Sequence, residues 1–399
     1  MTSPDADVYQ QNELAGHIFR TDLGTQFLYT EQFLQSHTRP VATTLPLREE
    51  PYTYPAGALA PFFTGLLPEG RRLTALKNSI KASSDDELSL LLAVGEDTVG
   101  DIRVLPHGVK LPELHVVQNV LSGVEDFKSI NFTDLLSTSG IVDESALPGV
   151  QEKVSGKMLT LPLQAATDCY FLKLNPPEYS RVVENESFFL SYARKLKSRT
   201  GIVQTKIVTD AKGRSGLLIK RFDRGVDASG KLVRYAVEDA CQVLNKYPAD
   251  KYNISAEEVC IALSQLTSRK VVARQEIFRQ FVYAWLTGNG DLHAKNLSII
   301  TQEHHGWELS PVYDIPSTAP YGDNTMALTL TGKRSGLSKA SLIRFAHTIG
   351  LREPAAERVI QKTLKDTQNL IEQVSDIGFD SHRQRQLIKT LKNRRRSLQ

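Results

Sequence analysis

Apolar and polar positions alternate along the first part of the chain, and this period of two is typical of β-strands. The alternation involves Ile18 and Phe19, then Phe27 and Tyr29, and finally Leu45 and Leu47. The predicted elements are strands between residues 13 and 48, a helix at 71–80, a helix from Ser83 or Ser84 to Val94, and a strand at 99–106. Glu87 is placed to close a capping box with Ser84. Residues 1–110 are therefore interpreted as a small domain that mixes helices and strands.

From residue 147 onward the pattern changes to strands followed by helices. Strands are predicted at 154–161, 169–175, 205–208 and 217–220, with a helix at 184–197 between the second and third. Helices are predicted at 238–244, 256–266, 273–287, 338–349 and 355–374, with a short hairpin at 297–300 and 307–309. In the helix at 273–287, Ile277, Phe281 and Trp285 recur at helical spacing. A strand-rich part ahead of a helix-rich part predicts an α+β fold with two lobes.

Composition supports a folded chain of more than one unit. At 399 residues the chain exceeds one ordinary core, and 41% hydrophobic with 23% charged residues is ordinary for a globular protein. The net charge of +3 gives no sign of nucleic-acid binding. Cys169, Cys241 and Cys260 stand far apart, which suits a reducing compartment and argues against a disulfide scaffold or a zinc site. Because the sequence shows no signal peptide and no membrane-spanning run, we expect a cytoplasmic protein without membrane contact.

The densest cluster of polar side chains lies at residues 287–314. A predicted helix ends just before Asp291, and Asn296 follows five residues later. Two short predicted strands then bring the chain back to Asp314. Phosphoryl transfer needs one group that accepts a hydroxyl proton and two that hold Mg²⁺ on the nucleotide phosphates. Asp291 fits the first role, while Asn296 and Asp314 offer the oxygen ligands that Mg²⁺ prefers.

Asp291 and Asn296 taken alone have a simpler explanation, because both residue types commonly form turns after a helix. Lys173 favours phosphoryl transfer. It lies in an apolar strand, where an unpaired ammonium group is costly to bury, and Glu186 on the following helix can pair with it. Such a strand-lysine and helix-glutamate couple positions nucleotide phosphates in kinases. The alternative for Lys173 is an edge strand, from which its side chain would reach water.

Three nearby features each allow two interpretations. Residues 147–153, LPGVQEK, could present backbone N–H groups and the charge of Lys153 to phosphates, or form an ordinary Pro-Gly turn. His293 could belong to a D-x-H metal site, or orient the loop by hydrogen bonding, which we favour. Lys295 could offer charge to the transferred phosphoryl group or be solvated. The chain has neither G-x-G-x-x-G nor a Walker motif, so an ordinary protein-kinase or P-loop assignment fails.

Several of these segments occur together in one known family. They are GLLPEG (65–70), LLAVGEDTVGD (91–101), LPGVQEK (147–153), FLKL (171–174), RFDR (221–224), EDACQVLN (238–245), GDLHAKN (290–296) and PVYD (311–314). In this order they resemble the HipA-type serine/threonine kinases, toxins of bacterial toxin–antitoxin modules, over nearly the whole chain. The resemblance implies an α+β, bilobed protein-kinase-like fold. Its parts would be a small N-terminal α/β subdomain (1–110), a kinase N-lobe with phosphate-covering loop, strand lysine and hinge (111–225), and a mostly helical C-lobe (226–399).

The resemblance also implies a kinase that depends on ATP and Mg²⁺. Asp291 would accept the proton of the substrate hydroxyl, and Asn296 and Asp314 would hold the metal. The implied nucleotide contacts begin with Lys173, paired with Glu186. The loop over the phosphates would be formed by Pro148, Gly149, Val150, Gln151, Glu152 and Lys153. The hinge against the adenine would be Lys220, Arg221 and Phe222, and the residues beside the nucleotide would be His293, Lys295 and Tyr313. The family often has Glu where this chain has Lys220.

The partners implied by the resemblance are a helix-turn-helix antitoxin and a protein substrate, typically an aminoacyl-tRNA synthetase. Operator DNA would be reached only through the antitoxin complex, in autoregulation of the operon. The basic residues Lys392 to Arg396 either touch DNA in that complex or form a solvated helix end.

Two other functions stay open. The Asp…Asn…Asp arrangement does not name the acceptor, so a small-molecule phosphotransferase is one alternative. The second is a catalytically silent subunit that joins an antitoxin as DNA corepressor. Loss of Asp291, Asn296 or Asp314 would mark that role, and all three residues are present.

Many family members carry a serine three residues before the loop glycine, and its autophosphorylation silences the enzyme. This chain has Ala146 at that position and Ser145 one residue earlier. Either Ser145 replaces the missing serine, or control rests wholly on a partner protein. Phosphosite mapping after incubation with ATP separates the two, because phosphate on Ser145 is expected only from the first, and its absence removes that option.

Overall fold

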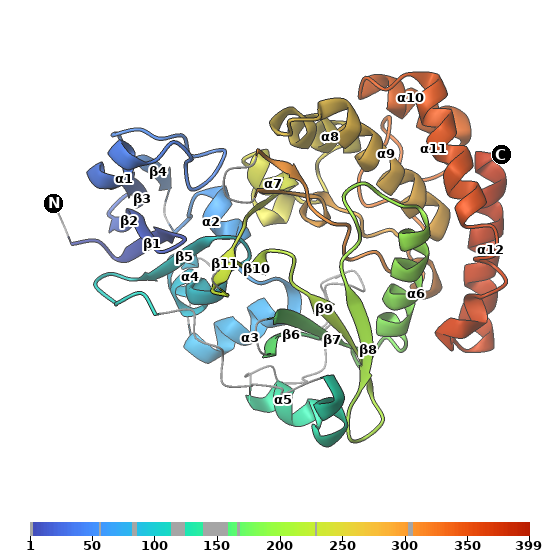
Figure 1. Ribbon diagram of the computed structural model, residues 1–399, viewed down its shortest axis with the longest axis horizontal. Helices are drawn as coiled ribbons and strands as arrows, with labels where there is room; N and C mark the ends of the chain where they lie inside the picture. The colour runs from blue at the N-terminus through green and yellow to red at the C-terminus, as the bar shows by residue number, and fades with distance from the viewer. Residues whose placement is uncertain are drawn as a thin grey trace.

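Helices and strands follow one another in three groups along the chain (Figure 1). The computed structural model describes residues 3–55, 57–81, 86–112, 124–138, 159–165, 168–227, 230–301 and 306–399. The first group, blue to cyan in Figure 1, lies at one end of the molecule, and the orange and red helices lie at the other. None of the helices within these ranges is both long and apolar enough to cross a bilayer.

The first group, called the N-terminal domain below, comprises the described part of residues 3–112. Its antiparallel sheet has the strand order β4-β3-β2-β1-β5. The elements are β1 (Ala6–Gln10), β2 (Glu13–Thr21), β3 (Gly24–Tyr29), α1 (Glu31–Ser36), β4 (Tyr52–Pro55), α2 (Pro61–Gly65), α3 (Gly70–Ile80), α4 (Glu87–Val94), the 3-10 turn η1 (Gly95–Asp97) and β5 (Ile102–Pro106). Alternate strand residues such as Ala6, Val8 and Ile18 are buried in one cluster with Phe33 of α1 and Phe62 of α2. Because alternate side chains of a strand point to the same face, the strands bury one apolar face, and this domain has its own hydrophobic core.

The second group is built on a four-stranded antiparallel sheet with the order β6-β7-β9-β8. Its elements are η2 (Val124–Ser129), α5 (Phe132–Thr138), β6 (Leu159–Ala165), β7 (Asp168–Leu174), α6 (Val182–Lys195), β8 (Thr205–Thr209) and β9 (Ser215–Lys220). Helix α6 covers the sheet, with Phe189 and Leu190 in the same buried cluster as Leu217 and Ile219 of β9. Strand β7 pairs on both sides, so the edge-strand interpretation of Lys173 is wrong.

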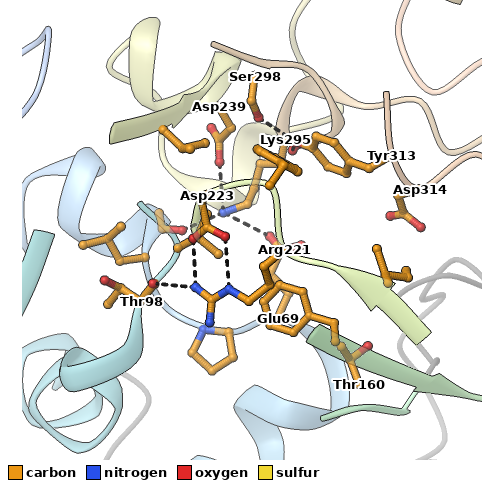
Figure 2. A pocket seen from close by; sticks show the side chains of 18 of the residues that line it. Glu69, Thr98, Thr160, Arg221, Asp223, Asp239, Lys295, Ser298, Tyr313 and Asp314 are labelled. Atoms are coloured by element: carbon orange, nitrogen blue, oxygen red, sulfur yellow. Dashed lines mark hydrogen bonds and ion pairs between the residues drawn. The ribbon is translucent and has the colours of Figure 1, made fainter. Parts of the chain in front are cut away.

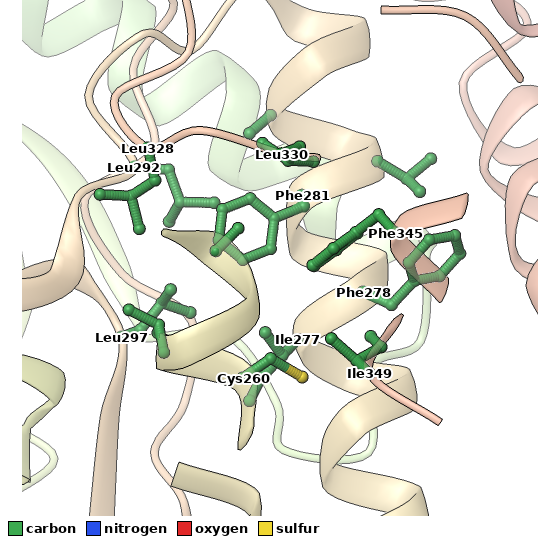
Figure 3. Packing of buried hydrophobic residues seen from close by; sticks show 14 of the residues in the cluster. Cys260, Ile277, Phe278, Phe281, Leu292, Leu297, Leu328, Leu330, Phe345 and Ile349 are labelled. Atoms are coloured by element: carbon green, nitrogen blue, oxygen red, sulfur yellow. The ribbon is translucent and has the colours of Figure 1, made fainter. Parts of the chain in front are cut away.

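The third group, called the helical lobe, comprises the described part of residues 236–399. Strands β10 (Arg224–Val226) and β11 (Leu232–Arg234) lead into it. Its elements are β12 (Ala236–Asp239), α7 (Ala240–Val243), η4 (Pro248–Asp250), α8 (Ala256–Leu266), α9 (Lys270–Thr287), η5 (Ala294–Asn296), β13 (Ser298–Thr301), β14 (Glu308–Leu309), η6 (Ala319–Tyr321), α10 (Lys339–Thr348), α11 (Glu353–Asp366), η7 (Val374–Ile377) and α12 (Ser381–Leu398). Helix α9 is buried at the centre, where Ile277, Phe278 and Phe281 pack with Phe345 of α10 (Figure 3). Strand β13 pairs with β12 and β14, and this small sheet fixes both ends of the predicted hairpin.

Most predicted elements are present, and the differences in the N-terminal domain have local causes. No strand forms at Leu45 and Leu47; Leu45 is buried in irregular chain, where its carbonyl accepts a hydrogen bond from the Tyr29 hydroxyl at 2.5 Å. Helix α4 begins at Glu87, and Asp86 is its N-cap, accepting from the Ser89 amide. The capping box with Ser84 is therefore wrong, because Glu87 instead accepts hydrogen bonds from elsewhere in the domain. Ser83 and Ser84 lie outside the described residues.

Three helices of the helical lobe differ from prediction. The helix predicted at 238–244 forms only as α7, since Asp239 ends β12 and caps α7 through a capping box with Gln242. The helix predicted at 355–374 is α11, which ends at Asp366. Residues 392–396 lie on α12, and Arg394 among them is buried, with a hydrogen bond to the Trp285 carbonyl at 2.8 Å. A solvated helix end therefore does not describe Arg394.

The N-terminal domain is attached to the helical lobe through buried polar contacts. Glu238, at 2% exposure, accepts hydrogen bonds from the amide and the hydroxyl of Thr43 at 2.8 and 2.7 Å. Two further bonds, from Gln242 to the Phe62 carbonyl and from Tyr247 to the Leu59 carbonyl, join the same surfaces. Burial raises the pKa of Glu238 to about 7, although the bonds from Thr43 oppose the shift.

This raised pKa predicts a measurable effect of pH on stability. The folded chain binds the Glu238 proton more tightly than the unfolded chain, so the free energy of unfolding falls as pH rises from the ordinary value of 4.5 to about 7. Glu238→Gln removes this titration, and we expect a curve of unfolding free energy against pH that is flatter by up to about 1.4 kcal/mol per pH unit in that window. Urea unfolding measures it, with Glu357→Gln on α11 as the control, and equal slopes for both variants would contradict the prediction.

Candidate active site

A cavity of about 310 Å³ opens where the N-terminal domain, the four-stranded sheet and the helical lobe meet (Figure 2). The N-terminal domain contributes Leu67, Pro68, Glu69, Arg72 and Thr98. The sheet and the segment after it contribute Thr160, Phe171, Lys173, Lys220, Arg221 and Phe222. The helical lobe contributes Asp239, Lys295, Asn296, Ser298, Tyr313 and Asp314. Charged groups of both signs thus surround a partly apolar space, which is the usual character of a small-molecule site.

Lys173 is held between two carboxylates. Its Nζ donates to both oxygens of Glu186 at 3.0 Å and to Oδ1 of Asp314 at 2.7 Å. Glu186 lies on α6 and has no exposed surface, so three separate segments meet at one ammonium group. Burial by itself lowers the pKa of Lys173, but Asp314 and Glu186 outweigh it and raise that pKa above its ordinary value. Lys173 in turn outweighs the effect of burial on Asp314 and holds the pKa of that carboxyl below its ordinary value.

The loop at 290–296 holds Asp291 in a closed setting. Asp291 has no exposed surface, and its Oδ1 accepts a hydrogen bond from the Tyr252 hydroxyl at 3.1 Å. Asn296 donates from Nδ2 to the Asp291 carbonyl at 2.9 Å, which orients the amide and leaves its oxygen as the atom it can offer to a metal. Gly290 is required here, because a Cβ atom would lie 2.5 Å from the Thr325 carbonyl oxygen.

The three residues predicted for catalysis and metal binding come together in part. Asn296 and Asp314 line the same cavity, whereas Asp291 is held against Asn296 and is not among the residues lining that cavity. Asp314 adopts a left-handed backbone conformation with φ of 54°. Such conformations cost energy outside glycine, although Asp tolerates them better than most residues, and they concentrate at functional sites.

Comparison with known proteins identifies the family. A model described as the HipA-like C-terminal domain matches residues 145–371, and one described as the HipA N-terminal domain matches residues 6–105. The chain belongs to the HipA family. Its HipA-type kinase assignment agrees with two similar proteins. The serine/threonine-protein kinase toxin HipA of Shewanella oneidensis is 26% identical over 76% of this chain and 72% of its own length. Y4mE of Sinorhizobium fredii, provisionally named a kinase, is 26% identical over 91% of this chain and 90% of its own.

A solved structure shows the same fold. In the Shewanella oneidensis complex of HipA, HipB and operator DNA, the matching chain superposes with a TM-score of 0.75 at 21% identity, covering 97% of both chains. The predicted α+β, bilobed, kinase-like fold is therefore confirmed for this HipA-family chain.

Lys295 of this HipA-type chain is neither solvated nor free. Its Nζ donates to the Gly65 carbonyl at 2.9 Å and pairs with Asp239 at 3.3 Å and Glu69 at 3.7 Å. The pKa of Lys295 is raised above its ordinary value, because the attraction of Asp239 and Glu69 outweighs the effect of burial, which would lower it. Glu69 also binds Lys251 at 2.8 Å, so the GLLPEG segment is tied to the helical lobe by two lysines. Glu69 is thus a site residue that was not predicted, although its segment carries part of the family resemblance.

The predicted hinge residues face different surroundings. Phe222 packs against Tyr313, with ring centroids 5.5 Å apart, and the Tyr313 hydroxyl also bonds Ser298 at 2.5 Å. Arg221 is buried and its guanidinium pairs with Asp223 at 2.8 Å, so its charge is already neutralised. Lys220 forms a half-exposed ion pair with Asp168 at 2.7 Å. Phe222 and Tyr313 therefore form the apolar part of this wall.

His293 packs edge-on against Tyr252, with ring centroids 5.2 Å apart. Within the described ranges it belongs to no group of three side chains spaced to hold a metal ion, and His304 and His305 lie outside those ranges. Residues 148–153, predicted to cover the phosphates, and Ser145 also lie outside the described residues.

Replacing Lys173 by Met is expected to reduce the free energy of unfolding by about 3–5 kcal/mol, because Glu186 is left buried without its counter-charge. Lys220→Met is the matched control, since it breaks a half-exposed pair worth at most about 1 kcal/mol. Urea unfolding measures both. Burial raises the pKa of Glu186, and Lys173 opposes that shift. Without Lys173 the folded chain holds the Glu186 proton to higher pH than wild type does, so the loss of stability in Lys173→Met grows as pH rises. An equal loss for the two variants would contradict the buried pair.

Proposed function

We propose that this HipA-type chain is an ATP- and Mg²⁺-dependent serine/threonine protein kinase that acts as the growth-inhibiting toxin of a toxin–antitoxin module. The observation that carries the proposal is the convergence of Lys173, Asn296 and Asp314 on one cavity beside Asp291. In this proposal residues 1–110, 111–225 and 226–399 are the N-terminal domain, the kinase N-lobe and the C-lobe.

The donor set fits nucleotide and magnesium. Asn296 and Asp314 present the hard oxygen ligands that Mg²⁺ prefers, and Lys173 adds a fixed positive charge for phosphate oxygens. When bound, ATP with Mg²⁺ would supply an electrophilic phosphoryl group. Phe222 and Tyr313 offer an apolar wall for a base. Residues 148–153 are proposed to lie over the phosphates. The backbone of Lys220 and Arg221 is proposed to contact the adenine.

Asp291 is proposed to accept the proton of the substrate hydroxyl. Its Oδ1 is held by the Tyr252 hydroxyl, and the bond from Asn296 to its carbonyl couples its position to the proposed metal ligand. The buried setting fixes the carboxylate before substrate arrives, which lowers the reorganisation needed during transfer. His293, packed on the same Tyr252, would keep the loop in this arrangement.

A protein acceptor and an antitoxin partner are proposed from the family. The Shewanella oneidensis structure contains HipA with HipB and operator DNA, and the shared fold over 97% of this chain supports a helix-turn-helix antitoxin that reaches operator DNA for it. An aminoacyl-tRNA synthetase is the proposed substrate class, on the sequence resemblance. We also propose a cytoplasmic location, where such a substrate is found.

Asp291→Asn tests the catalytic proposal. Without a base, transfer of labelled γ-phosphate to protein is expected to fall by about 10²–10⁴-fold, while ATP binding persists because Lys173, Asn296 and Asp314 are untouched. Asp366→Asn on α11 is the control and should retain wild-type transfer.

Growth of cells that express each variant provides the second measurement. The Asp291→Asn chain should no longer arrest growth, and phosphoproteomics against wild type should show the substrate. If the Asp291→Asn chain arrests growth as strongly as wild type does, the kinase proposal is replaced by the role of a catalytically silent DNA corepressor. If the labelled phosphate appears in metabolites instead of protein, the chain is a small-molecule phosphotransferase.

A further inference from the structure

Three side chains with metal-binding chemistry meet on the N-terminal domain, on elements that do not line the cavity. Asp7 lies on β1 directly opposite His17 of β2, and on its other side β1 pairs with β5, where Leu105 is its partner. His107 follows β5 by one residue. Since Ala6 and Val8 belong to the domain core, Asp7 and its two neighbours extend from the other face of the sheet.

Both imidazoles point at the same carboxylate oxygen. The Nδ1 atoms of His17 and His107 lie 2.7 and 2.8 Å from Oδ1 of Asp7. The second oxygen, Oδ2, accepts the backbone N–H of Gly108 at 3.0 Å. The ligand atoms of the three side chains all lie within 4.8 Å of one another. The Asp7 side chain is 5% exposed, that of His17 23%, and that of His107 40%, so the cluster has a buried base and an open side.

We propose that Asp7, His17 and His107 bind a divalent transition-metal ion of the Zn²⁺ type. Two imidazoles and a carboxylate are a common three-ligand set for Zn²⁺, with water in the fourth position, and the exposed side of His107 leaves room for that water. Ligand atoms around a tetrahedral Zn²⁺ stand roughly 3.3 Å apart for bonds near 2.0–2.1 Å. The two observed N–O separations therefore need to widen by only about half an ångström.

The surroundings prepare these residues for an ion. Asp7 and His17 lie on the paired strands β1 and β2, and His107 lies in the turn directly after β5, where its backbone N–H donates to the Asp5 carbonyl at 3.1 Å. Backbone hydrogen bonds therefore set the spacing of the three ligands. The Gly108 amide orients the carboxylate from behind, as outer-shell donors do in metal sites. The absence of paired cysteines therefore does not exclude zinc from this chain.

Bound metal would join β2, β1 and the turn after β5, and so would stabilise the N-terminal domain without entering the cavity. Calorimetric titration of the full-length chain with zinc chloride should show a site that Asp7→Asn, His17→Gln and His107→Gln each weaken by more than about tenfold. His37→Gln is the matched control, because His37 is another histidine of this domain that faces a carboxylate, and it should leave the affinity unchanged. Zinc should also raise the Tm of wild type and of His37→Gln, but not of Asp7→Asn.

Asp7→Asn keeps an acceptor oxygen for both imidazoles and loses only the bond from the Gly108 amide, so this variant should fold and should phosphorylate protein as wild type does. Cobalt(II) provides a spectroscopic readout, since a tetrahedral site gives strong visible absorption that the three variants should lose. Zinc affinity and cobalt spectrum unchanged in Asp7→Asn would overturn the proposal and leave a hydrogen-bonded cluster only. The test does not depend on kinase activity, so its failure is distinguishable from failure of the proposed function.

Discussion

The ammonium group of Lys173, buried between Glu186 and Asp314, is the interaction on which the site depends. Burying a charge is unfavourable unless its partners are in place, so β7, α6 and the segment after β14 must reach their final positions together. Asp314 is held in a left-handed conformation at the same point. The packing of α6 on the sheet and of α9 in the helical lobe stabilises the fold and offsets the cost of burying these charges.

A second charged cluster closes the cavity from the side of the N-terminal domain. Lys295, adjacent to Asn296, is bonded to the Gly65 carbonyl and lies between Glu69 and Asp239. Asp97, also on the N-terminal domain, pairs with Arg221 and Arg224, each at 2.8 Å. The N-terminal domain is therefore part of the wall of the proposed nucleotide site, and it contacts Lys295 of the 290–296 loop and Arg221 of the predicted hinge.

The sequence predicted those features whose cause is local. Apolar periodicity located most helices and strands, and the cost of burying Lys173 predicted its pairing with Glu186. The sequence did not predict that Glu69 reaches Lys295. This contact depends on how the N-terminal domain docks on the helical lobe, and a periodic apolar pattern carries no information about docking. The strand expected at Leu45 shows the same limit, since Leu45 is buried in the core from irregular chain. The capping box at Asp239 also makes a predicted helix begin at Ala240 instead of Glu238, through chemistry that the apolar pattern does not contain.

The contacts from Thr43 to Glu238 and from Glu69 to Lys295 have a thermodynamic consequence. Any molecule that fills the cavity touches both the N-terminal domain and the helical lobe, so its binding is coupled to the attachment of these two units. If a protein bound to the N-terminal domain changes the affinity of the cavity for its ligand by some factor, reciprocity requires that the ligand changes the affinity of the chain for that protein by the same factor. A protein bound to the outer surface of the N-terminal domain can therefore change ligand binding in the cavity through these contacts, without touching Asp291.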